Sequence, residues 1–157
     1  MALIPDIAKG WRNPADLAKA KLGKGEGAAL ATLLGACAMI FLAQWPRLAR
    51  EAHLDPEVPM DARLGAALMG IMFLLPLILY GVAVISQLVA WLFGARIGGY
   101  GARVALFWAL LCLSPLLLLH GLAIGFLGQG AAVLVLGLLV AAGFGYLWVR
   151  MLAGVRE

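Results

Sequence analysis

Residues Leu64 to Phe93, LGAALMGIMFLLPLILYGVAVISQLVAWLF, contain no Asp, Glu, Lys, Arg or His. A helix of this length would extend roughly 45 Å, whereas the hydrocarbon core of a bilayer is ~30 Å thick. A helix that is apolar on every side needs a large core or lipid around it, and a chain of 157 residues is too short to supply such a core. The stretch therefore predicts a membrane-spanning helix, in which Pro76 predicts a kink rather than a break.

The composition excludes a soluble globular domain. The chain is 64% hydrophobic and 13% charged, whereas a soluble domain carries about 25% charged residues. Its 20 glycines suit close contacts between helices in lipid. The net charge of +4 is not gathered into a basic run with interleaved aromatic residues, so we expect a lipid bilayer and no nucleic acid as the surroundings of this protein.

Three more apolar runs predict three further spans. The fold class expected is an all-α membrane protein, an antiparallel bundle of four transmembrane helices at residues 27–45, 64–93, 104–127 and 131–149. Trp45 at interface depth and Pro46 predict the end of the first span, and residues 46–63 predict an irregular or extended polar loop. The division expected is a basic segment at 1–26, a transmembrane domain at 27–150 and a short tail at 151–157.

The N-terminal segment holds five of the twelve Lys and Arg side chains. Asn13-Pro14 is a favourable helix start, and it predicts a helix of about nine residues that ends near Gly23. Trp11 and Leu17 among lysines are typical of a segment that lies on lipid headgroups, and a solvated tail is the alternative.

Orientation follows from the distribution of positive charge. If both termini are cytoplasmic, nine Lys and Arg side chains lie on the cytoplasmic side and three on the other side. Cytoplasmic segments carry the excess of Lys and Arg, so this arrangement is the one we expect.

Small residues predict where the helices touch. Gly121 and Gly125 share a face of the third span, and Gly137, Ala141 and Gly145 share a face of the fourth. Because the short turn Gly128 to Gly130 forces these spans to be antiparallel, we expect the two small faces to meet.

Three polar side chains inside the spans are candidate functional residues: His120, Gln87 and Tyr80. An ionisable group at membrane depth is a functional hypothesis by default. We expect His120 to make an interhelical hydrogen bond, with a ligand or proton-relay role alongside His53 as the alternative. Gln87 is expected to bond a neighbouring helix or to lie near the headgroups.

No motif for catalysis, a metal or a cofactor was found. Asp55, Glu57 and Asp61 lack the spacing of a calcium loop and have arginines nearby, so they predict a salt-bridged loop. The glycine-rich run at 98–101 lacks the Lys and Ser or Thr of a phosphate-binding loop, and no nucleophile lies in a catalytic pattern. We expect a protein that is not an enzyme and has no cofactor. Cys37 and Cys112 are expected to be small buried apolar side chains.

Several segments resemble bacterial membrane proteins of the Ypt/Rab-interacting (Yip) domain family. The likeness rests on Trp11 to Pro14, Phe41 to Arg50, Pro76 with Tyr80, and Tyr100 to Ala109. The resemblance implies a polytopic helical protein of the bacterial inner membrane with a cytoplasmic N-terminus. Its eukaryotic members are associated with membrane trafficking and small GTPases, a role that we do not transfer. The family typically has five spans, whereas four are expected here.

The preferred functional hypothesis is a scaffold or accessory subunit that packs against larger membrane proteins or a second copy of the chain. One alternative is a small oligomeric transporter or channel lined by Gln87, Tyr80 and His120. Another is a redox subunit with haem between His53 and His120.

Overall fold

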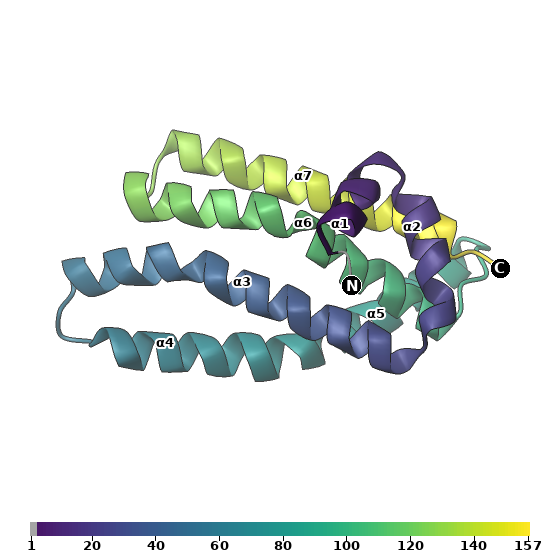
Figure 1. The fold of residues 1–157 in the computed structure, drawn as a ribbon, viewed down its shortest axis with the longest axis horizontal. Helices are drawn as coiled ribbons and strands as arrows, with labels where there is room; N and C mark the ends of the chain where they lie inside the picture. Colours follow the sequence, from purple (N-terminus) through teal and green to yellow (C-terminus); the bar gives the residue numbers. More distant parts are fainter. Residues whose placement is uncertain (1–2) are drawn as a thin grey trace.

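The computed structural model describes residues 3–157. Four of its helices are long and apolar enough to cross a membrane, and they pack together with two short N-terminal helices against them (Figure 1). This confirms the prediction of an all-α fold with four membrane helices. The helices are α1 (Leu3–Arg12), α2 (Pro14–Lys21), the 3-10 turn η1 (Leu22–Lys24), α3 (Glu26–Leu54), α4 (Met60–Met69), the π-helical turn η2 (Gly70–Leu74), α5 (Leu75–Leu92), α6 (Gly99–Leu127) and α7 (Ala131–Gly154).

Helix α6 is the centre of the bundle. From Gly101 to Ser114 every side chain except Arg103 and Leu110 is buried. Helix α3 packs along one side of α6, and α5 and α7 pack on other sides. The bundle therefore surrounds one helix rather than forming a closed ring of four.

Helices α3 and α6 run parallel, and small residues bring their backbones together. A methyl group placed on Gly121 would touch the Ala43 carbonyl oxygen and lie 2.8 Å from the Ala43 carbonyl carbon. One placed on Gly125 would touch the Pro46 ring and lie 3.0 Å from the Pro46 carbonyl carbon. The small face of α6 thus meets α3. Our expectation that this face meets α7 is therefore wrong.

The expected break at Pro46 is wrong, because α3 continues through it to Leu54. Proline removes one backbone donor, but contacts beyond it hold the next two turns in helical form. Leu48 is buried, and Arg50 Nη1 donates to the Gly125 carbonyl oxygen at 3.3 Å. Only residues 55–59 separate α3 from α4, so the irregular loop expected over 46–63 is much shorter.

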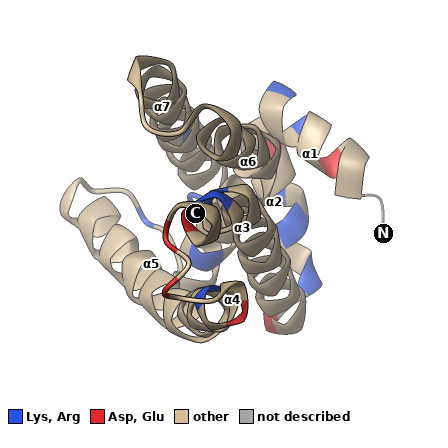
Figure 2. Ribbon diagram, turned by 90° about the vertical axis from the view of Figure 1, so that its left-hand side faces the viewer, with Lys and Arg blue, Asp and Glu red and all other residues tan. Residues whose placement is uncertain are grey.

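The second span is one continuous helix with a change of direction. The Leu75 N–H donates to the Gly70 carbonyl oxygen, five residues back, which is the π-helical spacing. This turn directly precedes Pro76, whose missing N–H interrupts the ordinary pattern. Figure 2 shows α4 almost end-on while α5 leads away obliquely. The predicted kink without a break is confirmed.

The N-terminal segment folds onto the bundle. The predicted helix after Asn13 is confirmed as α2, whereas α1 was not expected. Leu17 of α2 is buried, and Gly154 of α7 lies against the Ala15 backbone. The apolar side of α2 is therefore covered by protein and does not face headgroups alone.

Two ends of the bundle differ in charge, and we call them the basic end and the loop end. The basic end holds α2, η1, the connection at 93–98 and the C-terminus, where the Glu157 N–H donates to the Arg96 carbonyl oxygen at 2.9 Å. The loop end holds residues 55–59 and 128–130. Helix α7 extends to Gly154 with Met151 buried, so most of the expected tail at 151–157 continues the fourth helix. Between the ends, the ribbons of α5 and α7 are almost free of charged residues (Figure 2).

Candidate functional site

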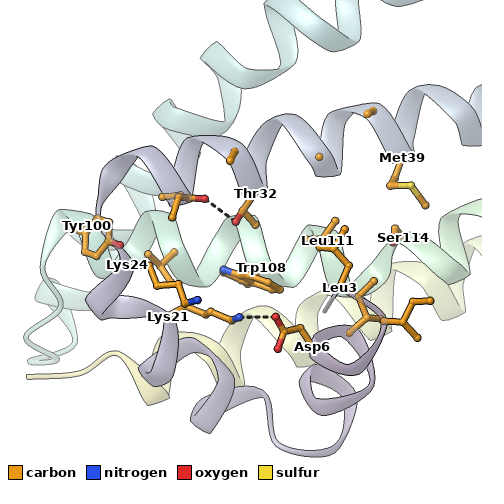
Figure 3. Close-up of a pocket in the computed structure, with 18 residues that line it drawn as sticks. Leu3, Asp6, Lys21, Lys24, Thr32, Met39, Tyr100, Trp108, Leu111 and Ser114 are labelled. Carbon is orange, nitrogen blue, oxygen red and sulfur yellow. Dashed lines mark hydrogen bonds and ion pairs between the residues drawn. The ribbon is translucent and has the colours of Figure 1, made fainter. Parts of the chain in front are cut away.

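A cavity of about 540 Å³ lies between α1, η1, α3 and α6, and Lys21, the last residue of α2, also lines it. Its wall is mostly apolar, and its two lysines and Tyr100 lie toward one end (Figure 3). Lys21, Lys24 and Tyr100 lie at the basic end, while Met39, Leu111 and Ser114 lie at the far end. The cavity therefore has lysines at one end, which we call its mouth, and a mostly apolar interior.

The hollow exists because one face of α3 lacks large side chains. Ala28, Ala31, Gly35 and Ala38 recur at intervals of three and four residues and all line the cavity. Residues three and four apart lie on one side of a helix, so these positions form a continuous shallow strip. From Ala28 to Met39 the strip extends roughly 16 Å along the helix, about half of a ~30 Å hydrocarbon core.

Charge at the mouth is only partly compensated. Lys21 Nζ is 2.5 Å from Asp6 Oδ2 and lies 4.5 Å from the centre of the Trp108 ring, a cation–π contact. Lys24 makes no ion pair with any residue in the described range 3–157. With one carboxylate against two ammonium groups, the mouth carries a net positive charge.

Two hydroxyl groups of the cavity wall lack partners. Ser114 is 1% exposed, and its Oγ has no hydrogen-bond partner within residues 3–157. The buried hydroxyl of Tyr100 is equally unpaired there. Thr32, by contrast, donates to the Ala28 carbonyl oxygen at 2.9 Å. Both unpaired oxygen atoms are inaccessible to solvent, so they face packed protein rather than the open space of the cavity.

A smaller polar pocket of about 360 Å³ lies toward the loop end. Its wall includes His120, Gln44, Arg47 and Gln129. The His120 imidazole faces α7 at Gly137, where an added methyl group would lie 3.2 Å from Nε2. Its interhelical hydrogen bond remains a prediction.

His53 does not line the pocket that holds His120. It lies in the last turn of α3, ten residues beyond Ala43, whose backbone contacts Gly121. Ten residues of helix span about 15 Å. The structure thus does not bring the two histidines together around a common ligand.

The other two polar candidates lie at separate places. Tyr80 packs edge-on against Phe107, with ring centres 5.4 Å apart. Gln87 lies toward the basic end, where an added methyl group on Gly99 would be 3.1 Å from Gln87 Oε1. Neither residue lines the cavity or the smaller pocket.

The small residues of α7 do not form one contact surface. Gly137 meets His120, Ala141 is exposed, and Gly145 has no heavy atom within 4 Å of an added methyl group. Another glycine, Gly143, lies against Trp11 of α1, 3.2 Å from an added methyl group. Only part of the ladder expected on the fourth span therefore contacts another helix.

The acidic loop is held by arginine. Arg63 Nη2 is 2.8 Å from Asp55 Oδ2, and Arg63 Nη1 is 3.6 Å from Glu51 Oε2. The predicted salt bridge is therefore present for Asp55, whereas Glu57 and Asp61 form no ion pair within residues 3–157. In the described range 3–157, no group of three or more His, Cys, Asp or Glu side chains is placed to hold a metal ion.

Sequence reasoning did not single out the cavity. Its signal was the strip of small residues on the first span, combined with Thr32 and Ser114 as hydroxyl groups inside apolar runs. Hydroxyl groups in membrane helices need a partner, so Ser114 could have been ranked with Gln87. Lys21 and Lys24 did not indicate a binding site in the sequence, because lysines are equally common in a solvated basic segment.

No family model, curated protein or solved structure matches this chain. The resemblance to the Yip domain family therefore remains a prediction that rests on the segments quoted above. The four long apolar helices support a multi-pass membrane protein.

Proposed function

We propose that this chain is a non-enzymatic accessory or scaffold protein of the bacterial inner membrane, which packs against a larger membrane protein. The observation that carries the proposal is the open arrangement around α6. Helices α5 and α7 each pack on α6, but within residues 3–157 they do not form a comparable contact with each other. A partner helix between them would complete the bundle.

The outward face of α5 supports the same proposal. Phe73, Leu77, Val84, Ile85 and Trp91 of the kinked span are each at least 60% exposed. A helix surface of this kind is covered either by lipid or by another membrane helix. The bend before Pro76 turns α5 away from α4 and presents this face laterally (Figure 2).

The transporter and haem alternatives receive less support. A pore lined by Tyr80, Gln87 and His120 needs these residues along one path. They lie instead on the α6 interface, near Gly99 at the basic end, and in the loop-end pocket. Haem ligation needs His53 and His120 to face each other, but His53 lies about 15 Å along α3 from Ala43, the residue that contacts Gly121 beside His120.

Photo-crosslinking in native membranes tests the proposed partner face. A photoreactive residue at Val84, Ile85 or Leu88 is expected to give a crosslinked protein band of defined mass, because these positions of α5 point outward. The matched controls are Leu30, Leu34 and Leu42, which are also exposed but lie on α3. If the α5 positions crosslink only lipid, or if α3 positions give the same band, the proposed α5 face is wrong.

The proposed topology has the basic end in the cytoplasm, because positive residues are enriched on that side of the membrane. A cysteine at Glu57 should react with a membrane-impermeant maleimide in intact cells, whereas cysteines at Lys19 or Arg156 should react only after the membrane is opened. The natural Cys37 and Cys112 are 0% exposed and should give little background. The proposal would be contradicted if cysteines at positions 19 and 156 were labelled from opposite sides of the membrane.

A further inference from the structure

We propose that the cavity between α1, η1, α3 and α6 binds one anionic phospholipid, with the phosphate at Lys24 and an acyl chain along α3. This site is independent of the proposed partner face on α5, because none of its wall residues comes from that helix. The proposal rests on the shape of the cavity and on its charge.

The interior has the form and chemistry of an acyl-chain site. Ala31, Gly35 and Ala38 leave a strip without large side chains, and Trp108 and Leu111 of α6 form the opposite wall. The cavity of about 540 Å³ is within the range of ~300–1,000 Å³ usual for ligand sites. Its length of roughly 16 Å corresponds to one leaflet of the bilayer.

The mouth fits a headgroup with a single negative charge. Lys24 has no ion pair within residues 3–157, and Lys21 shares its charge with Asp6. Tyr100 lines the same end of the cavity beside the two lysines (Figure 3). A headgroup without net negative charge would leave the charge at this mouth uncompensated.

The depth of the cavity agrees with a lipid whose headgroup is at the basic end. The ion pair between Glu26 and Arg103 marks the start of both α3 and α6 near the mouth. Helix α1 contacts α6 about two and a half turns further in, where the Trp11 indole N–H donates to the Cys112 carbonyl oxygen at 2.8 Å. Leu3, Ile4 and Ile7 of α1 line the cavity, so α1 covers the site from the side.

Lipid retention by the purified full chain tests the proposal. The delipidated protein in mild detergent is incubated with equal amounts of phosphatidylglycerol and phosphatidylcholine of identical chains, and the retained lipids are quantified by mass spectrometry. We expect about one phosphatidylglycerol per chain, retained in preference to phosphatidylcholine. Lys24→Gln should reduce its retention roughly fivefold, the factor for loss of one cation near a membrane surface.

Lys19→Gln is the matched charge control. Lys19 is exposed on the neighbouring helix and does not line the cavity, so its neutralisation should leave retention unchanged. Both lysines are at the surface, so neither change threatens folding. Equal effects of the two variants, or equal retention of the two lipids by the unmodified protein, would overturn the proposal.

A second pair of variants tests the acyl-chain strip. Gly35→Leu should abolish retention by filling the strip, because an added methyl group there has its nearest neighbour, Leu111, at 4.0 Å. Gly27→Leu on the same helix, with nothing within 4 Å, should have no effect. Unchanged retention in a folded Gly35→Leu protein would show that the chain lies elsewhere. Displacement of the lipid by excess inorganic phosphate would show a free-anion site and would equally refute the proposal.

Discussion

Replacement of Gly121 by Ala is expected to lower the free energy of unfolding by about 3 kcal/mol, at the upper end of typical over-packing costs. The added methyl group would touch the Ala43 carbonyl oxygen and lie 2.8 Å from its carbonyl carbon. Both atoms belong to the backbone of α3, so no side-chain rotation relieves the clash. Helices α3 and α6 must separate along their whole contact. Thermal unfolding in detergent would show the loss as a lower Tm.

Gly145→Ala is the matched control for this prediction. Gly145 lies in the middle of α7, and an added methyl group there meets no heavy atom within 4 Å. Alanine is favoured over glycine in a helix by up to about 1 kcal/mol, so this variant should be neutral or slightly more stable. A Gly121→Ala protein as stable as Gly145→Ala would refute the close contact between α3 and α6.

Gly154→Ala is expected to release the N-terminal segment from the bundle. Its added methyl group would touch the Ala15 carbonyl oxygen and lie 2.6 Å from the Ala15 Cα. Because both are backbone atoms of α2, that helix must move away from α7 and expose Leu17. Trypsin cleavage after Lys19 or Lys21 should become roughly tenfold faster, which corresponds to about 1.4 kcal/mol of lost docking.

Gly27→Ala provides the control at the same end of the bundle. It lies in the first turn of α3 and an added methyl group has no neighbour within 4 Å. Its cleavage rate should match that of the unmodified chain. If trypsin cleaves the Gly154→Ala chain no faster than the unmodified chain, the close contact between α2 and α7 is refuted.

The number and approximate position of the spans could be predicted from hydropathy. Summed over a window of about twenty residues, it measures the free energy of transferring the side chains from water into lipid. The kink before Pro76 followed from one missing backbone donor. Both are local properties of the chain, and both were confirmed.

Properties that depend on distant contacts were not predicted. Pro46 predicted the end of a helix. The helix continues beyond it because Arg50 donates a hydrogen bond to the end of α6 and Leu48 is buried. The small face with Gly121 and Gly125 suited either neighbour of α6, and spacing alone could not distinguish α3 from α7. The cavity forms only because α1 folds back over the strip of small residues on α3, and that contact could not be predicted from the local sequence. Leu3, Ile7 and Trp11 recur at helical spacing, which was the available signal for α1.

The parallel pairing of α3 with α6 has a consequence for biogenesis. Membrane chains are made from the N-terminus, and individually stable helices associate after insertion. The surface of α3 at Ala43, which contacts Gly121, lacks its partner while α4 and α5 are synthesised, because α6 forms the third span to enter the membrane. A nascent chain halted before Gly99 would therefore present this surface to chaperones, insertase or lipid. Assembly of the inner core begins only when α6 emerges.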